Sequence, residues 1–184
     1  DNYVSFTFSV YDFLARHGDV RVFRNTDSLE AVKSVEPKGV VISPGPSHPA
    51  GSLLSLEALA YFTGRVPILG ICLGMQAIAY WSGNTVRKGR TVMHGKVDRM
   101  DNRGGVLFKG IDREFAAVRY HSLVVDVDKG GFSVCAVSKS DGEIMAIENR
   151  EHRVFGLQFH PESYATPQGR TFISNFLEVC YGDA

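Results

Sequence analysis

A cysteine at a glycine-flanked turn is the feature that most constrains this chain. The segment Gly70-Ile71-Cys72-Leu73-Gly74 follows an apolar run that ends in Pro67-Ile68-Leu69, so the cysteine lies where a buried strand passes into a helix. Small residues on both sides let the backbone turn sharply, and the nucleophile then projects from the end of the sheet beside a free backbone N–H. The segment therefore predicts the thiol form of a nucleophile elbow at Cys72.

A second polar segment supplies the base and the carboxylate that such a thiol needs. Side chains alternate in the predicted strand 154–160, so Gln158, His160 and Glu162 face one way and the apolar residues between them face the other. Glu162 can then accept a hydrogen bond from His160 and fix its tautomer, as the third member of a catalytic triad does. Because the active sites of open α/β sheets lie beyond the carboxyl ends of the strands, we expect both residues to meet Cys72 there.

The order of the predicted elements indicates the fold class. Expected helices lie at 6–17, 28–35, 53–62, 73–82 and 169–180, and expected strands at 20–24, 39–43, 66–71 and 154–160. Residues 85–147 carry short strands separated by turns. We expect an α/β fold of three layers, an open and mostly parallel sheet flanked by helices, with an antiparallel or mixed portion. One domain covers residues 1–184, and the strand-like end Asp1-Asn2-Tyr3 leads us to expect apolar residues before it.

Composition excludes several classes of function. The 20 basic and 20 acidic residues are interspersed and give a net charge of zero, so no patch suits nucleic acid or an anionic membrane. The uncharged stretch 66–86 is interrupted by proline, glycine and polar residues, which predicts a buried strand and helix and not a membrane span. Three widely spaced cysteines argue against a disulfide framework and favour the cytoplasm. No ligand spacing indicates a metal site.

Two further segments are candidates for the rim of the site. The turn Pro44-Gly45-Pro46-Ser47 also follows a strand, so the N–H of Gly45 is a candidate to join that of Leu73 in an oxyanion hole. A plain tight turn is the alternative for Gly45. The polar patch Arg119-Tyr120-His121-Ser122-Leu123 is a candidate substrate rim, and both His94 and His121 stay open between a structural role, this rim and a partner surface.

These motifs together resemble the class I, triad-type glutamine amidotransferase domains. The matching pieces are Ser43-Pro44-Gly45-Pro46, the segment 70–76 from Gly70 to Gln76, and the segment 156–163 from Gly156 to Ser163. Asp1-Asn2-Tyr3, Ser5-Phe6-Thr7, His94-Gly95-Lys96 and Tyr120-His121-Ser122-Leu123 look like the glutaminase subunits of anthranilate and aminodeoxychorismate synthases. Val4, Ser47 and Met75 depart from residues common in that subfamily, but none of the departures removes a triad member.

The resemblance implies a reaction and a set of roles. Cys72 attacks the side-chain amide of glutamine, His160 protonates the leaving ammonia, and Glu162 orients His160. The remaining oxyanion and substrate positions are Gly45, Pro46, Ser47, Leu73, Gln76, Ser122 and Leu123. No cofactor is implied in this chain. Mg2+ and chorismate are expected on a partner synthase subunit that receives the ammonia.

Four interpretations remain open at this point. The chain is the glutaminase of anthranilate synthase, the same component of aminodeoxychorismate synthase or of both, a catalytically silent regulatory subunit, or a hydrolase of γ-glutamyl peptides. An intact Cys72, His160 and Glu162 argues against the silent subunit, and the peptide hydrolase leaves the anthranilate-type motifs unexplained.

Overall fold

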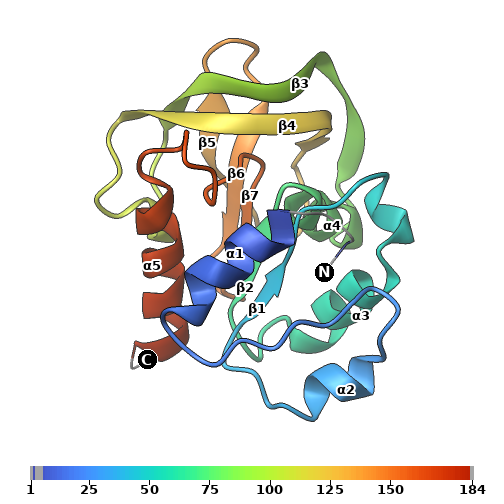
Figure 1. Ribbon diagram of the computed structural model, residues 1–184. Coiled ribbons are helices and arrows are strands. Elements are labelled where there is room, and N and C mark those ends of the chain that lie inside the picture. Colours follow the sequence, from blue (N-terminus) through green and yellow to red (C-terminus); the bar gives the residue numbers. More distant parts are fainter. Residues whose placement is uncertain (1, 3–5, 183–184) are drawn as a thin grey trace.

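The computed structural model describes residue 2 and residues 6–182, and within them one seven-stranded sheet carries helices on both faces (Figure 1). The strands lie in the order β1-β2-β7-β6-β5-β3-β4. Their bounds are β1 Val40–Ile42, β2 Ile68–Ile71, β3 Thr85–Asn102, β4 Glu114–Asp126, β5 Ser133–Ser138, β6 Ile144–Asn149 and β7 Val154–Leu157. The helices are α1 Phe6–Ala15, α2 Leu29–Lys33, α3 Leu53–Phe62, α4 Leu73–Trp81 and α5 Gly169–Tyr181, with 3-10 turns η1 Pro49–Gly51 and η2 Val106–Phe108.

The α/β fold class is confirmed, and the parallel part of the sheet is smaller than expected. Strand β2 pairs in parallel with β1 and β7, whereas β7–β6, β6–β5, β5–β3 and β3–β4 are antiparallel. Parallel pairing needs a crossover between the strands, as α3 provides between β1 and β2. Residues 85–149 form their strands without such helices, so the sheet is mixed.

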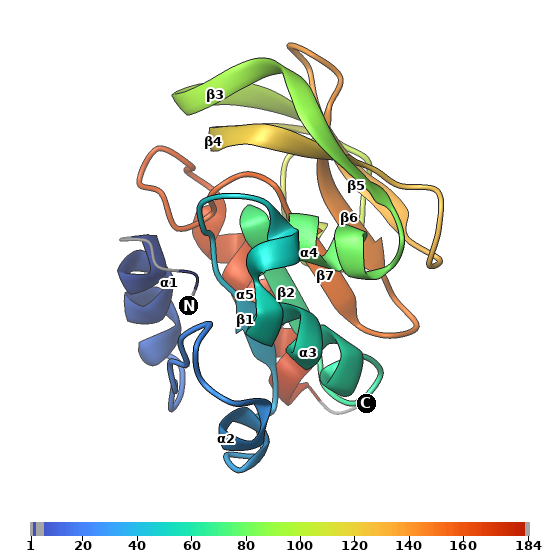
Figure 2. The same ribbon diagram turned by 90° about the vertical axis from the view of Figure 1, so that its right-hand side faces the viewer.

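Two apolar cores lie on opposite faces of the sheet. Leu14 of α1 and Phe176 of α5 belong to the core on one face, and Leu59 of α3 and Ile78 of α4 belong to the core on the other. Figures 1 and 2 show α1 and α5 on one side of β1 and β2, and α3 and α4 on the opposite side. The central strands are therefore covered on both faces, which gives the three expected layers.

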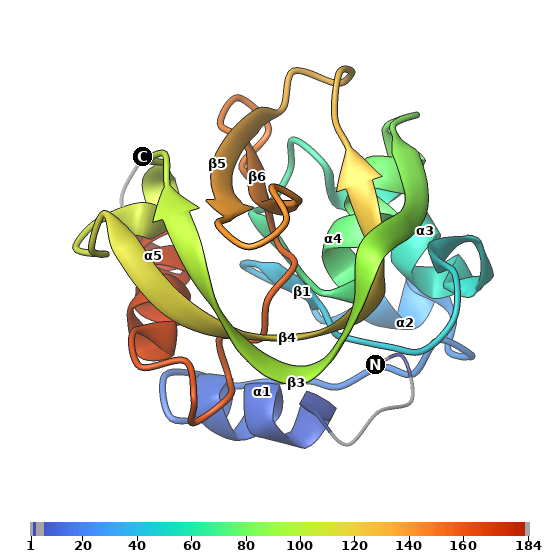
Figure 3. The same cartoon turned by 90° about the horizontal axis from the view of Figure 1, so that it is seen from above.

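The strands after α4 are longer than expected. β3 spans 18 residues and β4 spans 13, and they pair along most of their length with irregularities near residues 88–96. The two strands arch across one end of the molecule (Figure 3). Val118 of β4 forms an isolated bridge with His160, so β4 passes the carboxyl end of β7.

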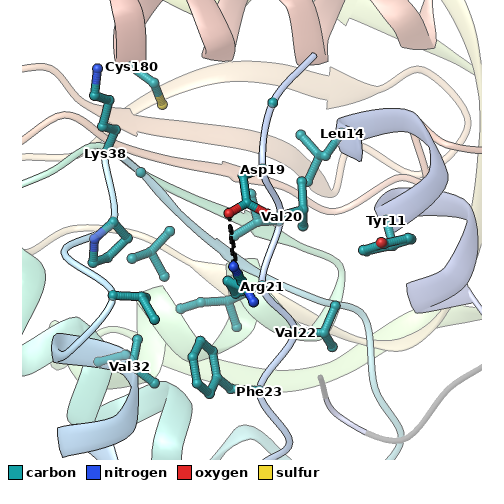
Figure 4. A pocket seen from close by; sticks show the side chains of 18 of the residues that line it. Tyr11, Leu14, Asp19, Val20, Arg21, Val22, Phe23, Val32, Lys38 and Cys180 are labelled. Atoms are coloured by element: carbon teal, nitrogen blue, oxygen red, sulfur yellow. Dashed lines mark hydrogen bonds and ion pairs between the residues drawn. The ribbon is translucent and has the colours of Figure 1, made fainter. Parts of the chain in front are cut away.

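The expected strand at 20–24 is wrong. A strand belongs to a continuous ladder of backbone hydrogen bonds, and the sheet of the described residues does not include residues 20–24. Val20, Val22 and Phe23 instead line a slot of about 650 Å3 together with β1 (Figure 4). Cys72 does not line the slot. The expectation of a first strand ending at Asp1-Asn2-Tyr3 falls outside the described residues, apart from Asn2.

The apolar stretch 66–86 folds as a buried strand and a helix. It contains β2, whose four residues are all buried, and α4. In the part of the chain that the structure describes, no helix has both the length and the apolarity to cross a membrane.

Candidate active site

The backbone at Cys72 has the sharp turn that the elbow prediction requires. Cys72 joins β2 to α4 with φ 54° and ψ −105°, a conformation that persists only where the surrounding structure holds it. Its N–H donates to the carbonyl of Leu157 on β7 at 2.7 Å, and its carbonyl accepts from the N–H of Gln76 at 3.2 Å. Cys72 therefore lies at the N-terminus of α4, where the helix dipole places a partial positive charge.

The two glycines of the elbow are required by packing. A Cβ on Gly70 would overlap the backbone of Gly74, and a Cβ on Gly74 would overlap the backbone carbonyl of Ile42 in β1. Because both residues lack a side chain, α4 packs directly against the ends of β1 and β2.

His160 and Glu162 form a buried pair beside the thiol. His160 Nδ1 lies 2.6 Å from Glu162 Oε1, and each side chain is 2% exposed. A carboxylate accepts, so the proton between them is on Nδ1. Cys72 is close enough to the imidazole to raise its pKa. The ring of Tyr120 lies edge-on to the imidazole with centroids 5.4 Å apart. The three residues that the sequence pattern singled out thus lie together at the end of the sheet.

Opposing effects act on the pKa of His160. Burial lowers this pKa, whereas hydrogen bonds with Cys72 and Glu162 raise it, and the net result is a rise from 6.5 to about 10. The imidazole therefore carries its proton across neutral pH, between the carboxylate and the thiol. In this arrangement sulfur can act as the nucleophile and the protonated imidazole as the proton donor.

The turn after β1 lies against the elbow. A Cβ on Gly45 would lie 2.4 Å from the Cβ of Asn2 and 2.5 Å from Leu73 Cδ2, so glycine gives the turn room beside both residues. Asn2 anchors the turn, since its N–H donates to Ser43 Oγ and its side-chain amide donates to the Ser43 carbonyl, both at 3.0 Å. The Leu73 side chain therefore lies against Gly45, which places the turn beside the elbow.

Strand β4 forms another edge of the site. Cys72 Sγ lies 3.7 Å from the carbonyl oxygen of Tyr120. The buried amide of Gln76 donates to the carbonyl of Leu123 and to Gln158 Oε1, both at 3.1 Å. Three further candidates, Pro46, Ser47 and Ser122, are exposed.

The other two cysteines lack this environment. Burial, assisted by the nearby Glu148 carboxylate, raises the pKa of Cys135 to about 12, and burial raises the pKa of Cys180 to about 11. Both thiols stay protonated at neutral pH. Among the described residues, no group of three or more His, Cys, Asp or Glu side chains is placed to hold a metal ion.

Sequence reasoning missed the buried partners of Arg119. This side chain is 0% exposed and forms ion pairs with Asp98 and Asp141, which are 21 and 22 residues away in the sequence. The sequence gives one signal of this burial, which is that Arg119 lies in a polar patch next to an apolar run.

Comparison with known proteins places the chain in one family. Residues 1–180 match the family model described as glutamine amidotransferase class-I. Aminodeoxychorismate/anthranilate synthase component 2 of Bacillus subtilis is 39% identical over 97% of this chain and 94% of its own length. Anthranilate synthase component 2 of Saccharolobus solfataricus is 41% identical over 96% of this chain and 95% of its own length.

Two further comparisons concern a longer relative and a solved structure. The bifunctional protein TrpGD of Thermotoga maritima is 38% identical over 97% of this chain, which spans 31% of that protein's length. The crystal structure of a candidate GMP synthase subunit from Thermoplasma acidophilum superimposes with a TM-score of 0.84 over 98% of this chain and 90% of its own, at 24% identity. The latter likeness concerns the fold alone.

The chain belongs to the class-I glutamine amidotransferase family. Within that family it is similar along nearly its whole length to the component 2 proteins of anthranilate and aminodeoxychorismate synthases.

Proposed function

We propose that this protein is the glutaminase subunit of anthranilate synthase. It hydrolyses L-glutamine to glutamate and ammonia in the cytoplasm, and the ammonia passes to a chorismate-binding synthase subunit for tryptophan biosynthesis. The hydrolytic part of the proposal rests on the contact of Cys72, at its strained elbow, with the buried pair His160–Glu162. The similarity to component 2 proteins supports the pathway.

The residues have the following roles in the proposed reaction. The Cys72 thiolate attacks the side-chain amide carbon of glutamine, and the backbone N–H groups of Gly45 and Leu73 stabilise the resulting oxyanion. His160 gives its proton to the leaving nitrogen, and ammonia departs from a γ-glutamyl thioester. His160 then takes a proton from water, which attacks the thioester and releases glutamate. Glu162 holds the imidazole through Nδ1 in both steps.

Gln76, Pro46, Ser47, Ser122 and Leu123 are proposed to bind the substrate around this centre. Gln76 is buried between the elbow and β4, while Pro46, Ser47 and Ser122 are exposed for contact with an incoming amino acid. No cofactor is proposed in this chain, and Mg2+ is assigned to the chorismate-binding partner.

The pH dependence of this reaction reflects the raised pKa of His160. Above about pH 10 the imidazole loses the proton that the leaving ammonia needs. We therefore expect kcat to stay constant through neutral pH and to decline above about pH 10. Glu162→Gln removes a carboxylate that raises the pKa of His160, so the decline is expected to move to lower pH. We also expect kcat at pH 7 to fall by about 10²-fold or more. The pH profile of glutamate release measures both effects.

Glu178→Gln is the matched control for this pH experiment. Glu178 is 64% exposed and forms an ion pair with Lys109 on the surface, so its variant should keep the wild-type profile. A decline at the same pH in wild type and Glu162→Gln contradicts the role given to Glu162.

The partner is tested by following the product of the reconstituted reaction. Glutamate release by the purified protein is measured alone and with an anthranilate synthase large subunit, chorismate and Mg2+, in wild type and Cys72→Ser. We expect Cys72-dependent release that rises with the partner, and formation of anthranilate. A full rate in the isolated protein that no synthase changes contradicts the coupling.

The second candidate is the corresponding component of aminodeoxychorismate synthase. It is favoured by the 39% identity to a component 2 whose description covers both synthases. Stimulation only by the large subunit of aminodeoxychorismate synthase, with aminodeoxychorismate as product, establishes this alternative. A silent regulatory subunit is excluded if a diazo-ketone analogue of glutamine forms an adduct with Cys72.

A further inference from the structure

Arg119 is completely buried in a polar cluster behind the substrate edge on β4. Its Nη1 donates to Asp98 Oδ2 at 2.5 Å and to Ser138 Oγ at 3.0 Å, and its Nη2 donates to Asp141 Oδ2 at 2.8 Å. The hydrogen bonds within the cluster hold the pKa values of both Asp98 and Asp141 below their usual range, against the effect of burial. Two ionised carboxylates therefore fix the orientation of one guanidinium.

This orientation directs the Nε–H of Arg119 at His121. Arg119 Nε lies 3.0 Å from His121 Nε2, and His121 Nδ1 lies 3.0 Å from the carbonyl oxygen of Leu123. A guanidinium N–H only donates, so Nε2 must accept, and the imidazole proton must lie on Nδ1. The ring is therefore a neutral Nδ1–H tautomer that donates to Leu123. Burial and the Arg119 charge lower the pKa of His121 to about 4, which agrees with a neutral ring.

The Leu123 carbonyl joins this relay to the active site. It accepts from His121 Nδ1 at 3.0 Å and from Gln76 Nε2 at 3.1 Å, which uses both of its lone pairs. Gln76 lies one helical turn after Cys72, and the carbonyl of Tyr120 lies 3.7 Å from the Cys72 sulfur. The stretch of β4 between Tyr120 and Leu123 is thus held at one end beside the thiol and at the other by the relay.

We propose that Arg119 and His121 are positioning residues. Arg119 sets the tautomer of His121, and His121 holds the Leu123 carbonyl so that the strand segment 120–123 keeps the shape that glutamine binds. Neither side chain touches the reacting atoms. The inference deepens the proposed function and rests on it, since it assigns part of the specificity for glutamine to a relay behind the binding edge.

Paired substitutions at His121 separate the two ends of the relay. His121→Asn places an amide near the Nδ1 position, so it retains a donor for Leu123 and loses the acceptor for Arg119. His121→Gln places a carbonyl near the Nε2 position, so it retains the acceptor and loses the donor, and His121→Phe loses both. We expect KM for glutamine to rise by about tenfold in the Gln and Phe variants, the effect of one lost hydrogen bond. In the Asn variant KM should rise less, and kcat should change little in all three variants.

Two further measurements distinguish positioning from a general structural role. Alkylation of Cys72 by iodoacetamide reports on the thiolate without using the glutamine site, so its rate should match wild type in all three variants. Nitrogen chemical shifts of His121 in the wild-type protein should show the proton on Nδ1. A proton on Nε2, an unchanged KM in His121→Phe, or equal losses of alkylation and binding would overturn the proposal. If wild type itself releases no glutamate, the proposed function fails, whereas the tautomer measurement still tests the relay.

Discussion

Replacing Cys72 by alanine is expected to abolish glutamine hydrolysis, with kcat falling by about 10⁴-fold or more, as happens when a nucleophile is removed from a triad. The substitution takes away the only atom that forms the thioester and leaves His160 and Glu162 with their 2.6 Å contact. Cys72 is 5% exposed, and loss of one sulfur atom removes little buried area, so the fold should be retained. Glutamate release and thermal unfolding of the same preparation measure the two effects.

Cys180→Ala is the matched control for the nucleophile. Cys180 is also a free thiol, but it is half-buried on α5 and its raised pKa of about 11 keeps it protonated. Its removal should leave kcat unchanged. Residual wild-type activity in Cys72→Ala, or a large loss in Cys180→Ala, would contradict the assignment of the nucleophile.

The triad candidates were predictable from sequence because the relevant geometry is local. The turn at Cys72 requires small neighbours, which a short segment displays, and the spacing of His160 and Glu162 follows from the alternation of a strand. That the two segments meet follows from parallel strands ending at one edge. The pairing of β2 with β7 in parallel, which places Cys72 N–H on the carbonyl of Leu157, bears this out.

Other features depend on contacts between distant segments and were not predictable. Residues 20–24 have the composition of a strand, yet composition does not determine whether a segment joins the sheet, and residues 20–23 line a slot instead. Arg119 is drawn into the interior by Asp98 and Asp141, and no local pattern joins residues on β3, β4 and the turn after β5. The extent of antiparallel pairing likewise depends on how β3 and β4 arch over the sheet.

Gly74→Ala is expected to destabilise the protein although alanine is the better helix former. In a helix, alanine is favoured over glycine by about 0.5–1 kcal/mol. The new methyl group would overlap the backbone carbonyl of Ile42, which is not the end of a flexible side chain and cannot turn aside. Overpacking of a rigid contact costs about 3 kcal/mol, so the overlap outweighs the helix propensity. The net cost of about 2–2.5 kcal/mol should lower the melting temperature by roughly 4–10 °C.

The same substitution is expected to lower activity, because it separates the two sides of the site. Relief of the overlap moves α4 away from the end of β1, and β1 leads into the turn that places Gly45 against Leu73. A wider gap between the turn and the elbow displaces the proposed oxyanion donors, so kcat should fall even below the melting temperature. Gly51→Ala is the control, since a Cβ there meets no atom within 4 Å and should change neither quantity. Equal melting temperatures for Gly74→Ala and Gly51→Ala would contradict the prediction, because they would mean that residue 74 has room for a side chain beside β1.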